Sequence, residues 1–271
     1  VKNMLVGQAI AESAAIFALV IAIVLLFAQP GEATFIASWG AIGAGLSMGL
    51  SAIGSGVGSG LPGGAACMGI VRQPEISNKI TTTMLIGSAV CQTPAIFGMV
   101  IAFLLLFVDF SNLPLYPGWA ALLGAGLATG LSAIGPGIGN GITAMEAVSG
   151  VSRHPETSTD ATRTMLIGMS VAQSTVIYGF LVSLMLLFYR FEASSSLSAA
   201  MCFLGAGFCS GFGGIGPGIG EGITAGYAVR GITRKPENTG LLMRTMLVGM
   251  AVAESTGIYA LIVSLLLIVV F

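Results

Sequence analysis

The sequence predicts an all-α integral membrane protein, built from tandem transmembrane helical hairpins with seven helices in all. Two compositional observations and one repeat predict this class. Of 271 residues, 55% are hydrophobic and only 8% are charged, whereas soluble domains carry about 25% charged residues. The mean hydropathy is +0.96, and long apolar segments alternate with short polar ones. One block of sequence also recurs along the chain.

The composition excludes several other classes of protein. With 10 Lys and Arg against 11 Asp and Glu, the net charge of −1 leaves no basic surface for nucleic acid. The 40 glycines follow no G-X-Y period and lie among apolar residues, which excludes collagen and disorder. The four cysteines form no CxxC pair and there is one histidine, so we expect small buried cysteines rather than a thiolate metal site.

The repeating unit is marked by the tetrapeptide Arg-x-Pro-Glu. It begins at Arg72, Arg153 and Arg234, and each step is 81 residues. Seven glycine triplets superpose at the same step, from Gly43, Gly124 and Gly205 to Gly60, Gly141 and Gly222. The second half of the unit occurs four times, as Met-Leu-Val-Gly or Met-Leu-Ile-Gly starting at Met4, Met84, Met165 and Met246. The chain is therefore a tandem array.

Each repeat consists of a glycine-rich segment, the polar loop and a segment rich in Leu, Ile and Val. These apolar segments run for about 25 to 35 residues, more than the roughly 20 that span a bilayer as a helix. A spanning segment must satisfy its own backbone hydrogen bonds, which favours helices over strands, and the loop prolines separate consecutive helices. The predicted helices cover residues 4–28, 35–71, 78–108, 117–151, 160–189, 197–232 and 240–271.

These helices define one incomplete hairpin and three complete ones. Residues 1–30 hold the outer helix of an incomplete hairpin, and residues 35–110, 117–191 and 197–271 each hold a hairpin. Because no glycine-rich partner precedes the first helix, we expect a fragment of a four-hairpin protein that lacks about 40 residues, judged from the repeat and its helix length. A native odd start is the alternative.

The glycine-rich helices are expected to form a crowded inner layer, with the bulkier helices outside. Glycine in a water-exposed helix costs about 1 kcal/mol relative to alanine, but the i, i+4 spacing of Gly54 and Gly58 makes a small-residue face that lets membrane helices approach closely. Pro136 and Pro217 lie in mid-helix and are expected to kink it, and Ser55 occupies the matching position of the first copy.

The distribution of Lys and Arg predicts the orientation. Only Arg190 lies at the end away from the Arg-x-Pro loops. The residues at the loop end are Lys2, Arg72, Lys79, Arg153, Arg163, Arg230, Arg234, Lys235 and Arg244. Because cytoplasmic loops carry the excess of positive residues, we expect the Arg-x-Pro loops to face the cytoplasm and the protein to lie in the cell membrane.

Three carboxylates lie deep in the apolar helices. Glu12, Glu221 and Glu254 each cost at least about 2.5–3.5 kcal/mol on insertion scales, so each is a functional candidate. Glu12 and Glu254 occupy equivalent positions in the second helix of the unit, where the two middle copies carry Gln92 and Gln173. Glu221 belongs to the glycine-rich helix, at the position held by Ser59 and Asn140 in the earlier copies. The middle copies therefore retain polar atoms but lose the charge.

At these residues the sequence resembles the proteolipid c subunits of the rotary F- and V-type ATP synthases, in a multi-hairpin form. The resemblance rests on the GxGPGxG helix, the Arg-x-Pro loop and the AESTGIY segment around Glu254. It implies a rotor ring that carries Na⁺ (or H⁺) on its carboxylates past a stator and couples this movement to ATP synthesis or hydrolysis. The chain itself would be a non-catalytic component of that complex and would need no cofactor beyond the transported ion.

The resemblance also implies partners and their contact points. We expect other c-type proteolipids in the ring, the a subunit of the stator, the proteins of the central stalk and membrane lipid, and no nucleic acid. The loops expected to contact the stalk contain Arg72, Gln73, Pro74, Arg153, His154, Pro155, Arg234, Lys235 and Pro236.

Ligand roles can be carried over most fully to the last hairpin. The resemblance makes Glu254 the ion-binding carboxylate, Ser255 a hydroxyl ligand and the Val252 carbonyl a backbone ligand. Tyr259 would support the site by a hydrogen bond, and Thr256 would help to hold a water. Glu221 lies four residues after Pro217, where sodium-binding members carry Gln or Glu.

The other copies depart from this pattern. Gln92 is followed by Thr93 and Pro94, with Phe97 in place of tyrosine, so this copy should hold no cation tightly. Gln173 keeps Ser174, Thr175 and Tyr178 but lacks the charge. Glu12 keeps Ser13, but Ala14 and Phe17 replace the threonine and the tyrosine.

The ligand set favours sodium. A hard cation takes several oxygen ligands, which Glu254, Glu221, Ser255 and a carbonyl can supply. Two carboxylates around one monovalent cation leave a negative charge, so one carboxyl is expected to stay protonated and the site to be neutral. A proton site needs one carboxyl only.

Two other functions fit part of the sequence. A tandem-repeat secondary transporter or channel would place polar groups at the midplane, but usually with inverted repeats and broken helices, whereas these repeats are parallel. A purely structural ring or fusion-pore proteolipid would have no need of Glu254.

Overall fold

The computed structural model describes residues 2–27, 35–110, 113–189 and 197–270, and the regular structure in these ranges is helical. The α-helices are α1 (Lys2–Phe27), α2 (Phe35–Arg72), α3 (Ser77–Cys91), α4 (Thr93–Phe107), α5 (Leu115–Ser132), α6 (Ile134–Arg153), α7 (Ser158–Ala172), α8 (Ser174–Phe188), α9 (Leu197–Arg234) and α10 (Thr239–Val269). Short 3-10 turns, η1 (Pro74–Ile76), η2 (Pro155–Thr157) and η3 (Pro236–Asn238), form the Arg-x-Pro loops.

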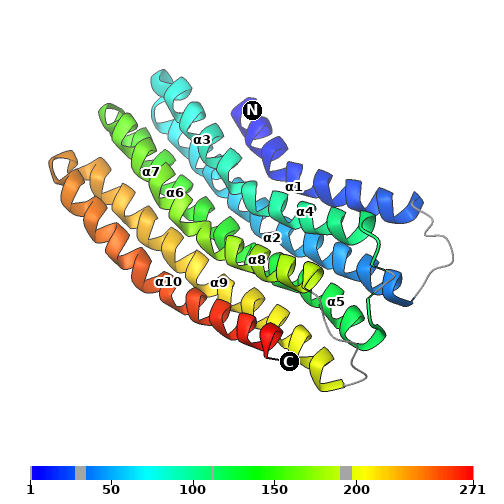
Figure 1. Ribbon diagram of the computed structural model, residues 1–271. Helices are drawn as coiled ribbons and strands as arrows, with labels where there is room; N and C mark the ends of the chain where they lie inside the picture. The colour runs from blue at the N-terminus through cyan, green and yellow to red at the C-terminus, as the bar shows by residue number, and fades with distance from the viewer. Residues whose placement is uncertain (1, 28–34, 111–112, 190–196, 271) are drawn as a thin grey trace.

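These helices make seven spans long and apolar enough to cross a membrane, which confirms the predicted fold class. Within the described ranges the spans are Met4–Phe27, Phe35–Arg72, Pro74–Phe107, Leu115–Arg153, Pro155–Phe188, Leu197–Arg234 and Pro236–Val269. The three 3-10 turns lie at one end of the bundle, and the N-terminal end of α1 points the same way (Figure 1).

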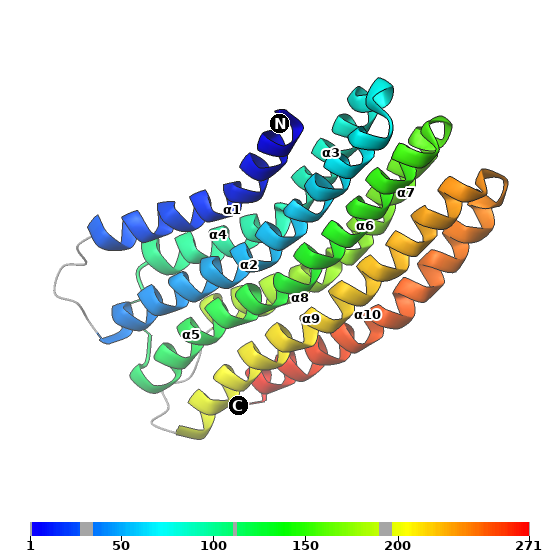
Figure 2. The same ribbon diagram turned by 180° about the vertical axis from the view of Figure 1, so that it is seen from behind.

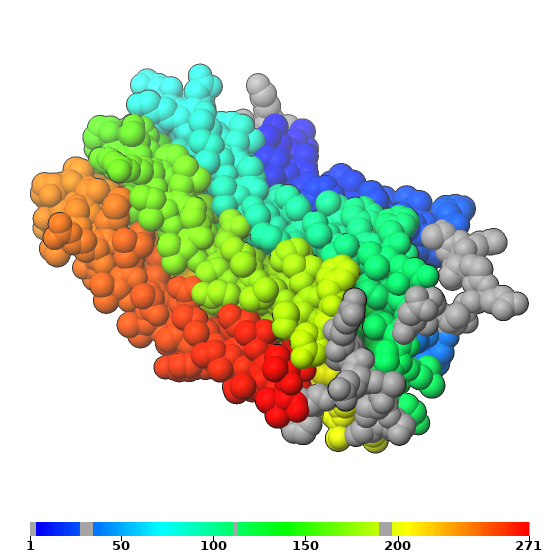
Figure 3. Space-filling model, viewed as in Figure 1, coloured from blue at the N-terminus to red at the C-terminus, as the bar shows by residue number. Residues whose placement is uncertain are grey.

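The spans form two layers. The glycine-rich spans α2, α5–α6 and α9 lie side by side, and α1, α3–α4, α7–α8 and α10 cover one face of them (Figures 1 and 2). An outer span contacts two inner spans, because α3 lies against both α2 and α6, and α7 lies against both α6 and α9. Seen from the outer face, the hairpins run across the molecule in chain order (Figure 3). Each of these outer helices therefore lies at a junction between neighbouring hairpins.

Glycine permits the close approach of the inner helices. A Cβ atom added at Gly58 would overlap the backbone of Gly137, and one added at Gly222 would overlap the backbone of Gly139. Small residues at such contacts are what dense packing between membrane helices needs. The glycine faces therefore fix the spacing of the hairpins.

The helix interruptions differ in part from those expected. The inner span Leu115–Arg153 breaks at Ala133, three residues before Pro136, which has no N–H to donate to the carbonyl of Ser132. By contrast, α9 runs through Pro217 without interruption. Two further breaks, at Gln92 and Gln173, were not expected, and they lie at the positions equivalent to Glu254. Pro94 follows the first of them, and nothing in the structure explains the second.

Candidate functional site

The carboxyl of Glu254 meets a tyrosine from the preceding hairpin. The hydroxyl of Tyr178, on α8, donates a hydrogen bond of 2.5 Å to Oε1 of Glu254, on α10. From the sequence we expected this supporting role for Tyr259, in the same hairpin as Glu254. In the structure Tyr178 makes the hydrogen bond to Glu254, and Tyr259 lies on the open face of α10 with 65% of its surface exposed. The reason is the packing of α8 against both α9 and α10, which places its side chains beside the next carboxylate.

Glu221, on the inner helix α9, is a second carboxyl close enough to interact with Glu254. It is completely buried on α9, and neither of its carboxyl oxygens has a hydrogen-bond partner. It interacts electrostatically with Glu254. A buried polar group without a partner costs about 1–3 kcal/mol, and a charged one costs more. The inner carboxyl therefore requires a proton or a cation.

Two hydroxyls on α8 are also buried, in the segment that carries Tyr178. Ser174 Oγ interacts with Tyr178, and Thr175 Oγ1 has no hydrogen-bond partner. A Cβ atom added at Gly257 would lie 3.5 Å from both Thr175 Cγ2 and Pro217 Cγ, so α8, α9 and α10 converge one turn beyond Glu254. Three helices from two hairpins thus meet beside Glu254, and the phenol of Tyr178 contacts its carboxyl.

The second copy shows a related arrangement with an amide in place of the carboxyl. Nε2 of Gln92, which is buried, donates to the carbonyl oxygen of Ile10 at 2.9 Å and to Oγ of Ser59 at 2.8 Å. Ile10 belongs to α1, and Ser59 is the counterpart of Glu221. Ser13 also donates to the Ile10 carbonyl, at 2.6 Å. The preceding outer helix thus contributes an oxygen to this site too, while Oε1 of Gln92 is buried without a partner.

The third copy has lost more of the pattern. Asn140, the counterpart of Glu221, is completely buried, and both polar atoms of its amide lack partners. The preceding outer helix carries Phe97, which packs against Phe180 with ring centroids 5.2 Å apart. Gln173 is half-buried. This junction has neither a carboxyl nor a phenol.

The residue type on each outer helix correlates with the hairpin that follows it. The residue five positions beyond the carboxylate position is Phe17 before Gln92, Phe97 before Gln173 and Tyr178 before Glu254. The phenol therefore occurs where the next hairpin has a carboxyl, and phenylalanine occurs where it has an amide. The correlation links the aromatic residue of one hairpin to the carboxyl or amide of the next hairpin, so it does not appear among the residues of a single hairpin.

The remaining predicted ligands lie on the two edges of the array. Glu12 is exposed on α1, and Val252 is 68% exposed on α10. Ser255 donates to the Val252 carbonyl at 2.7 Å, which repeats the bond from Ser13 to Ile10. Thr256 donates to the carbonyl of its own helix at Ala253, at 3.1 Å. The structure thus places Ser255, Val252, Thr256 and Tyr259 on the edge that follows Glu254.

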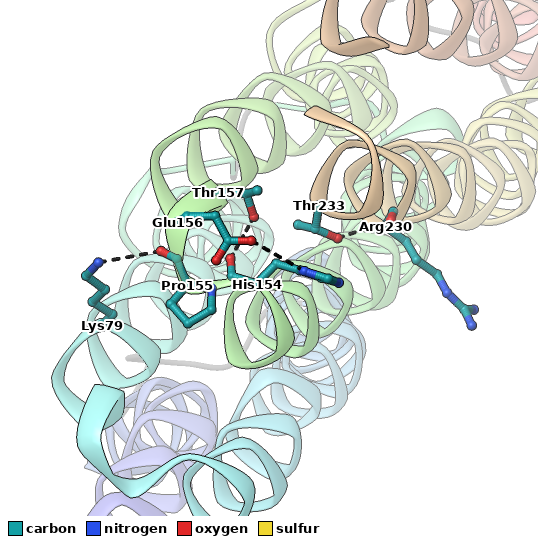
Figure 4. A network of polar contacts seen from close by, with 7 residues as sticks. All are labelled: Lys79, His154, Pro155, Glu156, Thr157, Arg230 and Thr233. Atoms are coloured by element: carbon teal, nitrogen blue, oxygen red, sulfur yellow. Dashed lines mark hydrogen bonds and ion pairs between the residues drawn. The ribbon is translucent and has the colours of Figure 1, made fainter. Parts of the chain in front are cut away.

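The Arg-x-Pro loops form a row of polar residues at one end of the bundle. Lys79 donates to the Pro155 carbonyl at 3.5 Å, which links two hairpins, and His154 Nδ1 lies 3.5 Å from Glu156 (Figure 4). In the same view, Thr157 donates to the carbonyl of His154, and Thr233 donates to that of Arg230. The exposed loop residues include Arg72, Pro74, Arg153, Arg234, Lys235 and Pro236, while Gln73, His154 and Pro155 are half-buried.

Repeated membrane hairpins with a carboxyl held between neighbours define an ion-carrying proteolipid. The chain belongs to the ATP synthase C subunit family, whose model matches residues 42–105, 123–186 and 204–267. Each match lies within one hairpin and covers most of it, so the family accounts for all three glycine-rich spans of the described chain.

Similar proteins agree with this assignment. The K subunit of the A-type ATP synthase of Methanocaldococcus jannaschii is 34% identical over 230 residues, which cover 84% of this chain and 94% of that protein. The ATP synthase c subunit of Alkaliphilus oremlandii is 49% identical over 71 residues, 26% of this chain and 80% of that protein. The ATP synthase c subunit of Thermotoga maritima is 47% identical over 68 residues, 25% and 80% of the two chains. These relationships support the rotor function over a tandem-repeat transporter.

Proposed function

We propose that this rotor protein carries Na⁺ at the junction before its last hairpin. The observation that carries the proposal is the buried Glu221, whose two carboxyl oxygens have no partner beside Glu254. A proton carrier needs one carboxyl, whereas here a second carboxyl interacts with it, and α8, which carries Tyr178, adds the buried hydroxyls of Ser174 and Thr175. Sodium is a hard cation that takes oxygen ligands, so these residues fit it.

The proposed ligands come from two hairpins. Glu254 and Glu221 belong to the last hairpin, whereas Ser174 and the Val171 carbonyl belong to the one before it. Val171 is the counterpart of Ile10, whose carbonyl faces the equivalent position in the second copy. One of the two carboxyls retains a proton, so that the loaded site is neutral and can face lipid. Tyr178 orients Glu254.

The edge of α10 would serve the next site of the ring. Val252, Ser255, Thr256 and Tyr259 repeat the ligand side of the Glu254 junction, and we assign Glu12 of a following c-type proteolipid to this edge. Tyrosine at position 259 fits this assignment, because the equivalent Tyr178 precedes Glu254. Glu12 would then belong to the junction with the neighbouring proteolipid. Ser13 would belong to the junction with the hairpin of residues 35–110, on the other side of α1.

The same proposal gives the remaining partners. The exposed arginines of the loops suit the central stalk, and the excess of Lys and Arg at that end suits the cytoplasm. The a subunit of the stator would face the outer helices, where the carboxylates lie. The complex would lie in the cell membrane and use the ion movement for ATP synthesis or hydrolysis.

Replacement of the carboxyl tests the site assignment. In the reconstituted complex, Glu254→Gln is expected to abolish sodium-stimulated ATP hydrolysis and sodium transport, because the hairpin loses its exchangeable charge. Asp160→Asn removes an exposed carboxyl on α7, outside the site, and serves as the matched control. Undiminished sodium-coupled turnover in Glu254→Gln would show that the carboxyl is not the carrier.

A further inference from the structure

The amide of Gln92 occupies a position between two oxygen atoms from different spans. Its Nε2 lies 2.9 Å from the carbonyl oxygen of Ile10, on α1, and 2.8 Å from Oγ of Ser59, on α2. The side chain is buried, so water does not compete for these bonds. The amide therefore ties α1 to the hairpin of residues 35–110.

Both partners offer lone pairs to this nitrogen. The Ile10 carbonyl can only accept, and the Ser59 hydroxyl donates its own hydrogen to the Ser55 carbonyl at 2.7 Å. Ser13 donates to the same Ile10 carbonyl within α1. Converging oxygen lone pairs are also what a hard cation requires. An N–H donor and a cation thus satisfy the same surroundings.

We propose that the Gln92 amide is a built-in substitute for the transported cation, which holds the second site closed. The proposal rests on the proposed function of the Glu254 junction. The hairpin of residues 35–110 then passes the stator without exchanging an ion, and its neutral amide stabilises the array where sodium stabilises a loaded site. A single change, Gln92→Glu, supplies the missing charge and opens a latent sodium site.

The third copy shows that this property is specific to Gln92. In the described part of the chain, no hydrogen bond joins the side chain of Gln173 to another group, and both polar atoms of Asn140 lack partners. The two glutamines occupy the same position of the repeat, but in the described residues only Gln92 forms hydrogen bonds to two other spans. Gln173 is a natural control for Gln92.

The first experiment labels the assembled ring with a carbodiimide and locates the modified carboxyls by peptide mass. In Gln92→Glu, a new label is expected at position 92, and sodium is expected to slow its formation at constant pH. Adding Ser59→Ala should keep the label but weaken sodium protection by about 10- to 100-fold, the usual effect of losing a group that supports a metal site. If the rate of labelling at position 92 does not change with the sodium concentration, the proposal is overturned.

Glu254 is the internal reference in every preparation. If sodium protects Glu254 and not position 92, this inference alone fails. If sodium protects neither, the proposed function fails and the inference fails with it.

A second experiment does not depend on a new carboxyl. Gln92→Met keeps the length of the side chain but removes the amide, and it is expected to lower the temperature at which the ring dissociates in detergent. Gln173→Met removes an amide that ties no spans together and should leave that temperature close to the wild-type value. Equal effects of the two substitutions would contradict the bridging role of Gln92.

Discussion

Tyr178 of one hairpin donates its hydroxyl hydrogen to Glu254 of the next. This bond crosses the junction between hairpins, so the environment of Glu254 depends on the copy that precedes it. The repeat pattern follows the same rule, because Phe17 and Phe97 precede the two glutamines. The surroundings of Glu254 therefore come from two hairpins.

Removing this phenol should weaken sodium binding at Glu254. Hydrogen bonds to charged groups contribute about 1.5–3 kcal/mol in soluble proteins, and bonds between membrane helices average about 0.6 kcal/mol. We therefore expect Tyr178→Phe to raise the sodium concentration that half-protects Glu254 from carbodiimide by roughly threefold to a hundredfold. Tyr259→Phe is the matched control and should affect Glu12 instead. Equal effects on Glu254 would contradict the assignment across the junction.

The inner carboxyl can be tested separately. Glu221→Ala removes a ligand without altering the glycine face, so it should lower sodium affinity strongly while the ring still assembles. Sodium protection of Glu254 and the yield of assembled ring measure the two effects. Asn140→Ala, at the equivalent position of the third copy, should leave the protection of Glu254 unchanged. A normal sodium affinity in Glu221→Ala would remove this residue from the site.

The glycine contacts predict which substitutions disturb the inner layer. Gly139→Ala would force a methyl group against the backbone of Gly218, and overpacking of this kind costs about 1–3 kcal/mol. Gly60→Ala has open space around the added atom and should be tolerated. Thermal dissociation of the detergent-solubilised ring compares the two. Equal stability of both variants would show that the close approach of α6 and α9 does not fix the spacing of the hairpins.

The number of carboxylates predicts the ion-to-ATP ratio. Two of the four outer-helix positions, at Glu12 and Glu254, carry a carboxyl, so a ring made only of this chain should move about half as many ions per turn as one charged in every hairpin. Each ion costs about 2.3 kcal/mol per 100 mV, and fewer ions per ATP leave more free energy for each. Such a rotor is suited to pumping sodium against a steep gradient, or to mixing with single-hairpin proteolipids in a synthase.

Counting sodium ions transported per ATP hydrolysed in reconstituted vesicles measures this ratio. A value of one ion per hairpin in a ring containing only this chain would mean that Gln92 or Gln173 sites also carry ions. A value near half of that is expected.

The spans and the carboxyls can be predicted from the sequence alone, because both depend on local properties. Apolar length determines the helices, and a carboxyl such as Glu254 is conspicuous in an apolar segment. The contact of Tyr178 with Glu254 depends instead on the packing of α8 against α9 and α10 of the next hairpin. The spacing of residues within one hairpin does not predict this packing. The helix break at Gln173 could not be predicted either, because no proline follows it as Pro94 follows Gln92. Glu221 was identified from its position, but its lack of partners is visible only in the structure.

Carbodiimide labelling of Glu254 in the wild-type ring tests the central claim most directly. At constant pH and ionic strength, replacing potassium with sodium should slow the modification of Glu254, because a bound sodium ion displaces the proton that the reagent requires. Glu12 should respond in the same way once its junction is complete. A labelling rate that follows pH but does not change with sodium would show that the site carries protons, and would contradict the sodium assignment.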